Sequence, residues 1–437
     1  MKKVISVVTA FLMVLVVFAG CAKQAPTSSA SSDTSKEKAT LTIAWWGNQT
    51  RNDCTQAVMK MYTNKYPNVT LQPVFVDWAS YWTKLATQQA ANAAPDVMQM
   101  DYGYLDQYVS KQLLLDLTPY TKNGILDTAN IPKPVLASGS VNNKLYAVSL
   151  GTNVLSLVYD AAALAKAGVP EPTSTWTWAD FDTIIGKVYK ATAVKAEPLF
   201  FTDGSQWIEY QARAYGYSLF SKDGKSLGFT DKKILTDVYD RLLKLTKDGS
   251  FVSPDKVAPL TTIEQNPIVG GTAWLSSCWS NQFVALQAAA KRDLKMINMP
   301  INTDGKKQAL YDKPSQFFSV SSTTQYKDVA ARFVSYFEND IDANKILLAE
   351  RGVPTSSKVL DGIKSSVMPT VAQTFDYINF VDSKNLTTAI DPPSPTAGSQ
   401  VLAASKDSYY KVAYQKSTPT QAATDFMTQA NSILSTQ

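Results

Sequence analysis

The order of apolar and polar positions after residue 40 predicts strands and helices in alternation. Three short apolar runs are typical of buried strands, at residues 41–46, 69–76 and 97–100. Between them, apolar side chains recur at helical spacing from Cys54 to Tyr62, and an alanine-rich helix is predicted over residues 82–93. This β-α-β-α-β order predicts an α/β fold in which a mostly parallel sheet is flanked by helices.

Two later segments carry the residues that begin helices. Thr177 and Asp180 are placed as a near capping box for a helix that runs through Tyr189. Near the end of the chain, Thr418 precedes a proline and stands three residues before Gln421, which is typical of a helix start. No Gly/Ser-rich linker divides the chain after residue 40, so two lobes would share several crossings instead of a single tether.

The first forty residues predict an export signal and a tether. Lys2 and Lys3 precede an apolar run, which is short for a membrane span and is typical of a signal peptide over residues 1–20. Two small residues then precede Cys21, as in a bacterial lipobox, where the cysteine is lipidated (palmitate among its acyl groups). Residues 21–39 are rich in serine and poor in large apolar side chains, which predicts a flexible tether. The alternative is a plain signal peptide or a membrane anchor with a chance cysteine.

Composition excludes several classes of function. The chain has 42 basic and 37 acidic residues and no histidine. A net charge of +5 without a basic stripe argues against nucleic-acid binding. The lack of histidine excludes Ser-His-Asp and Cys-His catalysis and histidine-bound zinc. No glycine-rich phosphate loop follows a strand, so no nucleotide cofactor is expected, and no calcium-loop spacing indicates a metal. Cys54 and Cys278 are expected to be free thiols.

Aromatic and polar side chains follow the predicted strands at the points where the strands end. The candidates are Trp46, Asn48, Trp78, Asp101 and Tyr102 near the first three strand ends, with Trp207, Glu209 and Trp279 further along the chain. In an open parallel sheet, ligands bind outside the carboxyl ends of the strands. An indole face packs against the C–H face of a pyranose, while carboxylate and amide groups hydrogen-bond its hydroxyls, so this pattern favours a sugar ligand.

Each of these residues also has a structural interpretation. For any single tryptophan, a role as a core anchor is about as well supported as a contact with a ligand, because this side chain is usually mostly buried. Asp77 is better explained as a helix cap. Arg351 precedes a glycine, where it could cap a helix that ends near Glu350.

Several stretches, taken in order along residues 40–437, resemble the extracellular solute-binding proteins of family 1, which are sugar-binding lipoproteins of ABC importers. The most specific match is Ala-Pro-Asp-Val-Met-Gln-Met-Asp at residues 94–101. The other matching stretches are residues 41–47, residues 75–78 with Tyr81 and Trp82, residues 143–149 followed by Asn153, residues 175–180, and Arg-Gly-Val-Pro-Thr at residues 351–355.

The resemblance implies two α/β lobes joined by a hinge of two or three crossings, with the ligand in the cleft between them. Carried over to this chain, one lobe comprises residues 40–151 plus 316–356, and the other comprises residues 152–315 plus 357–437. The family positions that contact ligand would here be Asn48, Asp101, Asn153, Trp279 and Arg351.

The function that the resemblance implies is capture of a mono- or oligosaccharide outside the cytoplasm and its delivery to the permease of an ABC transporter. The sugar would stack on Trp279, with Trp46 or Trp207 opposing it. The protein would be a monomer anchored to the bacterial cell membrane through Cys21. One alternative is a glycoside hydrolase that uses two carboxylates, such as Asp101 with Glu209 or Glu264. Another is the same fold binding a different solute, such as glycerol phosphate or a peptide.

Overall fold

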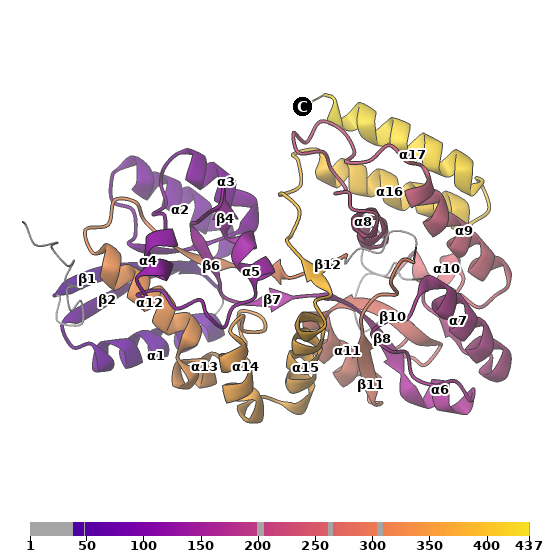
Figure 1. Cartoon of the computed structure of the whole chain (residues 1–437), viewed down its shortest axis with the longest axis horizontal. Coiled ribbons are helices and arrows are strands. Elements are labelled where there is room, and N and C mark those ends of the chain that lie inside the picture. Colours follow the sequence, from indigo (N-terminus) through magenta and orange to yellow (C-terminus); the bar gives the residue numbers. More distant parts are fainter. Residues whose placement is uncertain (1–37, 48, 199–204, 261–264, 304–308, 437) are drawn as a thin grey trace, which may run out of the picture.

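The computed structural model describes residues 38–47, 49–198, 205–260, 265–303 and 309–436. These residues form two α/β lobes that lie side by side (Figure 1). Each lobe has its own sheet, a five-stranded one in lobe 1 and a four-stranded one in lobe 2. The two-lobed α/β architecture expected from the sequence is therefore confirmed. The assignment of residues to each lobe beyond these sheets and their helices stays a prediction.

Lobe 1 is built on a sheet with the strand order β2-β1-β3-β14-β6. Strand β1 runs parallel to both β2 and β3, whereas β14 runs antiparallel to β3 and β6. The strands are β1 (Ala39–Trp46), β2 (Val69–Val76), β3 (Val97–Met100), β6 (Ala147–Ser149) and β14 (Phe317–Val320), with a hairpin of β4 (Ser140–Val141) and β5 (Lys144–Leu145). The helices are α1 (Gln49–Lys65), α2 (Trp78–Ala90), α3 (Tyr102–Ser110), α4 (Thr118–Lys122), α5 (Lys133–Ser138), α12 (Lys327–Asn339) and α13 (Ile341–Leu347).

The two tryptophans at the end of β1 lie on opposite faces of this sheet, because successive side chains of a strand alternate. Trp45 is fully buried in the core that α1 and α12 cover, together with Tyr62 and Phe333. Trp46 belongs to the core on the other face, which α2 and α3 cover. The apolar run at residues 41–46 is thus continuous because both faces of the strand are covered by helices.

Lobe 2 has a sheet with the strand order β11-β8-β10-β9. Strand β8 is antiparallel to both β10 and β11, so this sheet is not the mostly parallel one that the sequence predicted. The strands are β8 (Leu155–Asp160), β9 (Lys195–Ala196), β10 (Ala273–Trp279) and β11 (Leu294–Ile297). The helices are α6 (Ala161–Lys166), α7 (Trp178–Thr192), α8 (Ser205–Ala214), α9 (Lys233–Lys247), α10 (Pro254–Val257), α11 (Phe283–Ala290), α15 (Pro369–Ser383), α16 (Gly398–Ala413) and α17 (Pro419–Leu434), with a 3-10 turn η3 (Ser280–Gln282).

The predicted helix caps are present. Asp77 caps α2 by accepting a hydrogen bond from the backbone N–H of Ser80. Thr177 and Asp180 form a complete capping box at the start of α7. Thr418 accepts a hydrogen bond from the Gln421 N–H at the start of α17. These short-range signals were correct because a cap depends on residues only three positions apart.

Three segments of the chain, two of them short strands, lie together where the lobes meet. Strand β7 (Thr152–Asn153) pairs with β13 (Lys313–Pro314), and the Thr152 N–H donates to the Val353 carbonyl at 2.8 Å. A Cβ on Gly151 would stand 2.3 Å from the carbonyl oxygen of Arg351, so only glycine fits at this approach. The chain therefore crosses between the lobes in closely packed strands.

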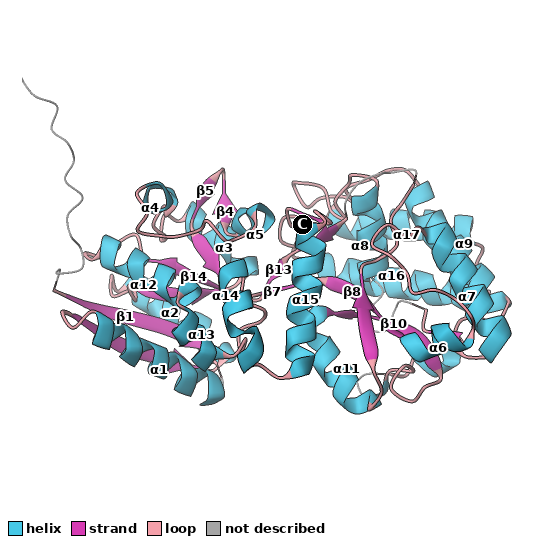
Figure 2. Cartoon of the chain, turned by 60° about the horizontal axis from the view of Figure 1, so that its bottom comes forward, coloured by secondary structure: helices cyan, strands magenta, loops and turns pink. Residues whose placement is uncertain are grey.

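Helices and two short strands complete the junction. Figure 1 and Figure 2 both place α14 (Ser357–Ile363) and α15 between the two sheets. The remaining elements are a 3-10 turn η4 (Lys364–Ser366) and the pair β12 (Leu310–Tyr311) and β15 (Thr387–Thr388). Within the described ranges, no helix combines the length and the apolar character that crossing a membrane requires.

Candidate functional site

An aromatic pair lies at the end of strand β10 in lobe 2. Trp279 is the last residue of β10, and it is only partly buried although the six residues before it are buried. The ring of Tyr311 lies edge-on to it, with the ring centroids 5.8 Å apart. The ammonium nitrogen of Lys313 stands 4.8 Å from the Trp279 ring centroid. The end of β10 thus presents an indole within reach of a phenol and a cation.

The carboxyl group of Glu209 lies beside this aromatic pair. Glu209 projects from α8, and the Tyr311 hydroxyl donates a hydrogen bond to its Oε2 atom at 3.4 Å. Burial raises the pKa of Glu209 to about 7, with the charge of Asp391 adding to the rise, while Arg213 and Tyr311 oppose it. A carboxyl group with this pKa exists in both protonation states near neutral pH, so it can either donate or accept a hydrogen bond.

Arg213 fixes the backbone that borders this carboxyl group. It is buried, and its Nε donates to the Ala309 carbonyl at 2.8 Å, while Nη2 donates to the Thr388 hydroxyl at 2.6 Å and to the Ala389 carbonyl at 2.8 Å. Its Nη1 forms an ion pair with Asp391. Arg213 was not among the residues that the sequence pattern singled out, although it stands four residues after Glu209 and so on the same face of α8.

The segment at residues 389–397, which we call the strap, runs from β15 to α16 along the edge of lobe 2 that faces lobe 1 (Figure 1). It contains three prolines, Pro392, Pro393 and Pro395, which limit its backbone to extended conformations. The Tyr102 hydroxyl of lobe 1 donates a hydrogen bond to the Asp391 carbonyl at 2.6 Å. The strap is thus held from one side by Arg213 and from the other by Tyr102.

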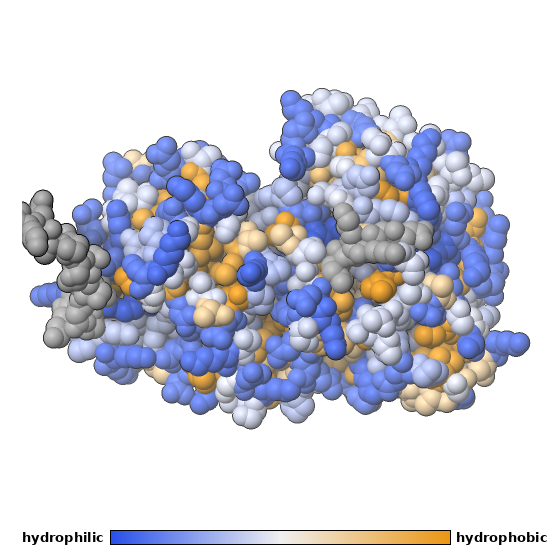
Figure 3. Space-filling view, in the orientation of Figure 1, coloured by the Kyte–Doolittle hydropathy of each residue, from blue (hydrophilic) through white to orange (hydrophobic). Residues whose placement is uncertain are grey.

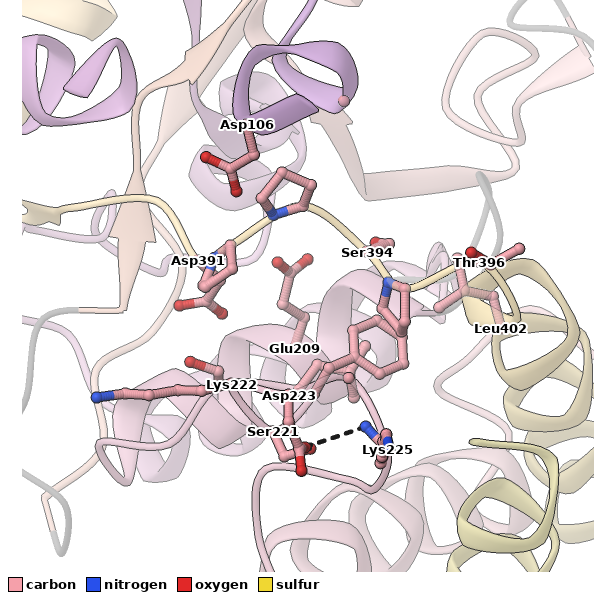
Figure 4. Close-up of a pocket in the computed structure, with 18 residues that line it drawn as sticks. Asp106, Glu209, Ser221, Lys222, Asp223, Lys225, Asp391, Ser394, Thr396 and Leu402 are labelled. Atoms are coloured by element: carbon pink, nitrogen blue, oxygen red, sulfur yellow. Dashed lines mark hydrogen bonds between the residues drawn. The ribbon is translucent and has the colours of Figure 1, made fainter. Parts of the chain in front are cut away.

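A cavity of about 480 Å³, which we call the strap pocket, opens between the lobes beside the strap. Its lining comes from Gly103 and Asp106 of α3, Glu209 of α8, the loop at residues 218–225, strap residues 391–396 and Leu402. Figure 4 shows Asp106 on one side of the strap and Glu209 on the other. The space-filling view in Figure 3 shows the surface hollowed between the two lobes. Both lobes therefore contribute to this cavity.

On lobe 1, the predicted residues have well-defined local partners. Trp46 is 9% exposed, and Trp78, at the start of α2, packs edge-on against it with the ring centroids 4.9 Å apart. Trp78 itself is 46% exposed and so offers ring surface to a ligand. Asp101 caps α3 by accepting a hydrogen bond from the Gly103 N–H at 2.8 Å.

The structure does not bring Trp207 or Arg351 to an open surface. Trp207 is 1% exposed and stacks on Trp178 in the core of lobe 2, so it cannot oppose Trp279 across a cleft. Arg351 is 4% exposed, and its Nη2 donates to the Thr55 hydroxyl at 2.8 Å. Burial lowers the pKa of Arg351 to about 10, as does the nearby charge of Arg51. Trp207 therefore follows the core-anchor interpretation. Arg351 is also structural, but it does not cap a helix: α13 already ends at Leu347, and the guanidinium binds Gln99 and Thr55 instead.

Asn153 occupies the hinge strand β7 with its side chain 9% exposed. Its amide oxygen is buried and has no hydrogen-bond partner among the residues that the structure describes. A buried acceptor without a partner is costly, so this atom is suited to a hydroxyl from a ligand or water. Asn48, Glu264 and Cys21, which the sequence also singled out, lie outside the described residues.

Two cysteines and the possible metal-binding groups remain to be placed within the described residues. Cys54 on α1 and Cys278 on β10 are free and lie in different lobes, as predicted. Burial raises the pKa of the Cys278 thiol to about 12, which removes the reactive thiolate at neutral pH. Among the described residues, no group of three cysteine or carboxylate side chains could hold a metal ion.

Comparisons with known proteins agree with this architecture. A family model described as "Bacterial extracellular solute-binding protein" matches residues 57–373. A solved family 1 extracellular solute-binding protein from Alicyclobacillus acidocaldarius is 32% identical, with 91% of this chain and 98% of that one covered and a TM-score of 0.85.

Two more distant solved structures share the fold. A periplasmic oligogalacturonide binding protein from Yersinia enterocolitica is 21% identical, with 90% of this chain and 98% of that one covered and a TM-score of 0.72. An ABC substrate-binding protein from Listeria monocytogenes, solved in complex with cycloalternan, is 19% identical, with 91% and 99% covered and a TM-score of 0.62.

Proposed function

This chain belongs to the extracellular solute-binding proteins of family 1, and on that premise we propose that it captures a saccharide between its lobes and delivers it unchanged to an ABC permease. The observation that carries the proposal is the partly exposed indole of Trp279, flanked by the Tyr311 ring and by Glu209. An aromatic face beside hydroxyl-binding groups suits a pyranose. Two structural neighbours are described by their binding of oligogalacturonide or cycloalternan, which supports a carbohydrate ligand.

In this proposal the sugar ring packs on Trp279, and polar groups from both lobes bind its hydroxyls. Glu209 and the unpartnered amide oxygen of Asn153 are the acceptors in lobe 2 and at the hinge. Trp78, Asp101 and Tyr102 are the contacts from lobe 1. Arg351 and Trp207 contribute indirectly, because they hold the packing beneath these surfaces.

Closure of the lobes would follow from differential affinity, because a ligand that contacts both walls binds the closed state more tightly than the open one. A micromolar dissociation constant corresponds to about 8 kcal/mol of binding free energy. One aromatic contact with several hydrogen bonds, some of them to charged groups, reaches that value.

Titration calorimetry against a panel of mono- and oligosaccharides tests the proposal. We expect one or more sugars to bind and to be recovered unchanged after prolonged incubation. Trp279→Ala should weaken that binding by at least about tenfold, or 1.4 kcal/mol. Asp101→Ala should weaken it less, because this carboxylate also caps α3. The proposal fails if no saccharide binds, or if the Trp279 variant binds as tightly as the wild type.

We further propose that the chain works outside the cytoplasm as a monomer that is tethered to the cell membrane through a lipid on Cys21. The sequence around Cys21 supports this, since an apolar run and two small residues precede it. Metabolic labelling with a clickable palmitate analogue tests the anchor. Label should enter the wild type and be absent from Cys21→Ser, whereas Cys54→Ser, which keeps the lipobox, should label normally.

A further inference from the structure

The strap pocket adjoins the Trp279 wall. Glu209 lines both the strap pocket and a hollow of about 10 Å³ beside Trp279, Tyr311 and Leu155. A ligand that reaches from Trp279 past Glu209 would therefore enter the strap pocket. The volume of about 480 Å³ falls within the range of roughly 300–1,000 Å³ that is typical of small-molecule sites.

The lining of the strap pocket has the two kinds of surface that a sugar needs. Apolar surface comes from the half-buried Phe220 and from the prolines of the strap. Hydroxyl groups come from Ser221, Ser394 and Thr396. Since a pyranose has C–H faces and a rim of hydroxyls, this lining complements a sugar ring.

The charges of the strap pocket are unfavourable to an anion. Asp106 and Glu209 line it, and neither takes part in an ion pair with another described residue. Asp391 is neutralised by Arg213. Lys222, Asp223 and Lys225 also line the pocket. The Lys222 side chain extends away from Asp106 and Glu209 (Figure 4), and Lys225 lies beside Asp223, to which its backbone N–H donates at 3.1 Å. A ligand carboxylate placed here would meet Asp106 and the partly ionised Glu209, and like charges repel at sites that are partly screened from water.

We infer that the strap pocket is a second subsite, which holds the units of an uncharged oligosaccharide beyond the ring on Trp279 and disfavours uronic acids. This inference rests on the proposed function and narrows it in two respects: the ligand has at least two sugar units, and the units in the strap pocket carry no carboxylate. The chain would then differ in ligand charge from its oligogalacturonide-binding neighbour.

Calorimetry with the purified full-length protein tests both respects. The probes are neutral hexose mono-, di- and trisaccharides in several linkages, with galacturonic acid and its trimer as charged counterparts. We expect the best neutral trisaccharide to bind at least about tenfold more tightly than its monosaccharide, and at least about tenfold more tightly than the uronate trimer.

Three variants connect these differences to the strap pocket. Thr396→Trp places a large side chain at an exposed position of the lining. The trisaccharide should then bind less than about twofold more tightly than the monosaccharide. Glu209→Gln keeps the shape of the side chain but removes its charge. The ratio of the affinity for the neutral trisaccharide to that for the uronate trimer should fall by about fivefold or more. Asp361→Asn, at an exposed acid of α14 that does not line the pocket, is the matched control and should change neither ratio.

The outcomes separate this inference from the proposed function. If mono- and trisaccharides bind equally well, or if the uronate trimer binds as tightly as the neutral one, the second subsite is refuted while sugar binding stands. If the Thr396→Trp variant still binds the trisaccharide at least about tenfold more tightly than the monosaccharide, the additional sugar units lie elsewhere and the inference is likewise refuted. If no saccharide binds, the proposed function itself fails.

Discussion

The hydroxyl of Tyr102 donates a hydrogen bond to the backbone carbonyl of Asp391 at 2.6 Å, and this bond joins α3 of lobe 1 to the strap of lobe 2. Burial raises the pKa of Tyr102 well above its usual value, so the hydroxyl keeps its proton and stays a donor throughout the physiological range. Because the bond joins the two lobes, its loss should favour their separation.

Tyr102→Phe removes only this hydroxyl. A hydrogen bond of this kind contributes about 0.5–1.5 kcal/mol, so the equilibrium between closed and open lobes should shift roughly 2- to 12-fold toward the open state. Spin labels on the outer surfaces of the two lobes, measured by electron resonance without ligand, would report the shift. Tyr104→Phe is the control, because Tyr104 lies on the same helix but stacks on Trp82 within lobe 1. Identical distance distributions for Tyr102→Phe and the wild type would contradict the prediction.

Two tryptophans of lobe 2 should respond in opposite ways to truncation. Trp279→Ala should weaken sugar binding while changing stability little, because its ring is partly exposed. Trp207→Ala should cost about 3–5 kcal/mol of folding free energy, because it leaves a cavity in a closed core. Urea denaturation and calorimetry on both variants measure the two effects. Finding that Trp207→Ala is stable and loses only ligand affinity would reverse the roles assigned to the two rings.

Arg351 should act on stability, because it is buried within lobe 1 and binds Gln99 and Thr55. Arg351→Ala should lower the free energy of unfolding by roughly 3 kcal/mol, since it leaves buried polar groups without a partner. Lys345→Ala, which breaks an exposed pair with Asp342, should cost less than about 1 kcal/mol. Thermal unfolding measures both. A stable Arg351→Ala variant with lost affinity would instead restore its predicted contact with the ligand.

The buried carboxyl group of Glu338 should make stability depend on pH. Burial raises its pKa from 4.5 to about 7, although the Thr355 hydroxyl and N–H donate hydrogen bonds to it. Between pH 4.5 and 7 the folded state therefore binds more protons than the unfolded state, so this group lowers stability as pH rises. The full cost is at most about 3.5 kcal/mol, at 1.4 kcal/mol per pKa unit over the rise from 4.5 to about 7.

Glu338→Gln removes this cost while keeping an acceptor for Thr355. The variant should be close to the wild type in stability at pH 4.5 and more stable at pH 8, as measured by urea denaturation across that range. The difference in unfolding free energy between the variant and the wild type at each pH reports Glu338 alone, because the other buried acids are the same in both proteins. A stability difference that does not change with pH would show that Glu338 does not titrate in this way.

Local sequence patterns predicted much of the fold. The apolar runs at residues 41–46 and 97–100 became strands of one sheet, and Asp77, Thr177 and Thr418 cap helices as expected. The antiparallel sheet of lobe 2 was not predicted, because strand direction depends on pairing between distant segments. Strand β8 pairs with β10 across more than a hundred residues, and no local signal records that choice.

The sequence by itself determined which short segments form helices and strands, where several helices begin, and that indoles and acids stand near strand ends. Only the tertiary structure decided which of them reach the surface between the lobes. Trp207 and Trp279 are the same residue type, yet one lies in a closed core and the other ends a strand and is only partly buried. Arg213 and Asp391 are 178 residues apart and meet only because the strap returns across lobe 2. Burial and contact across such separations come from how whole elements pack, and local spacing cannot encode them.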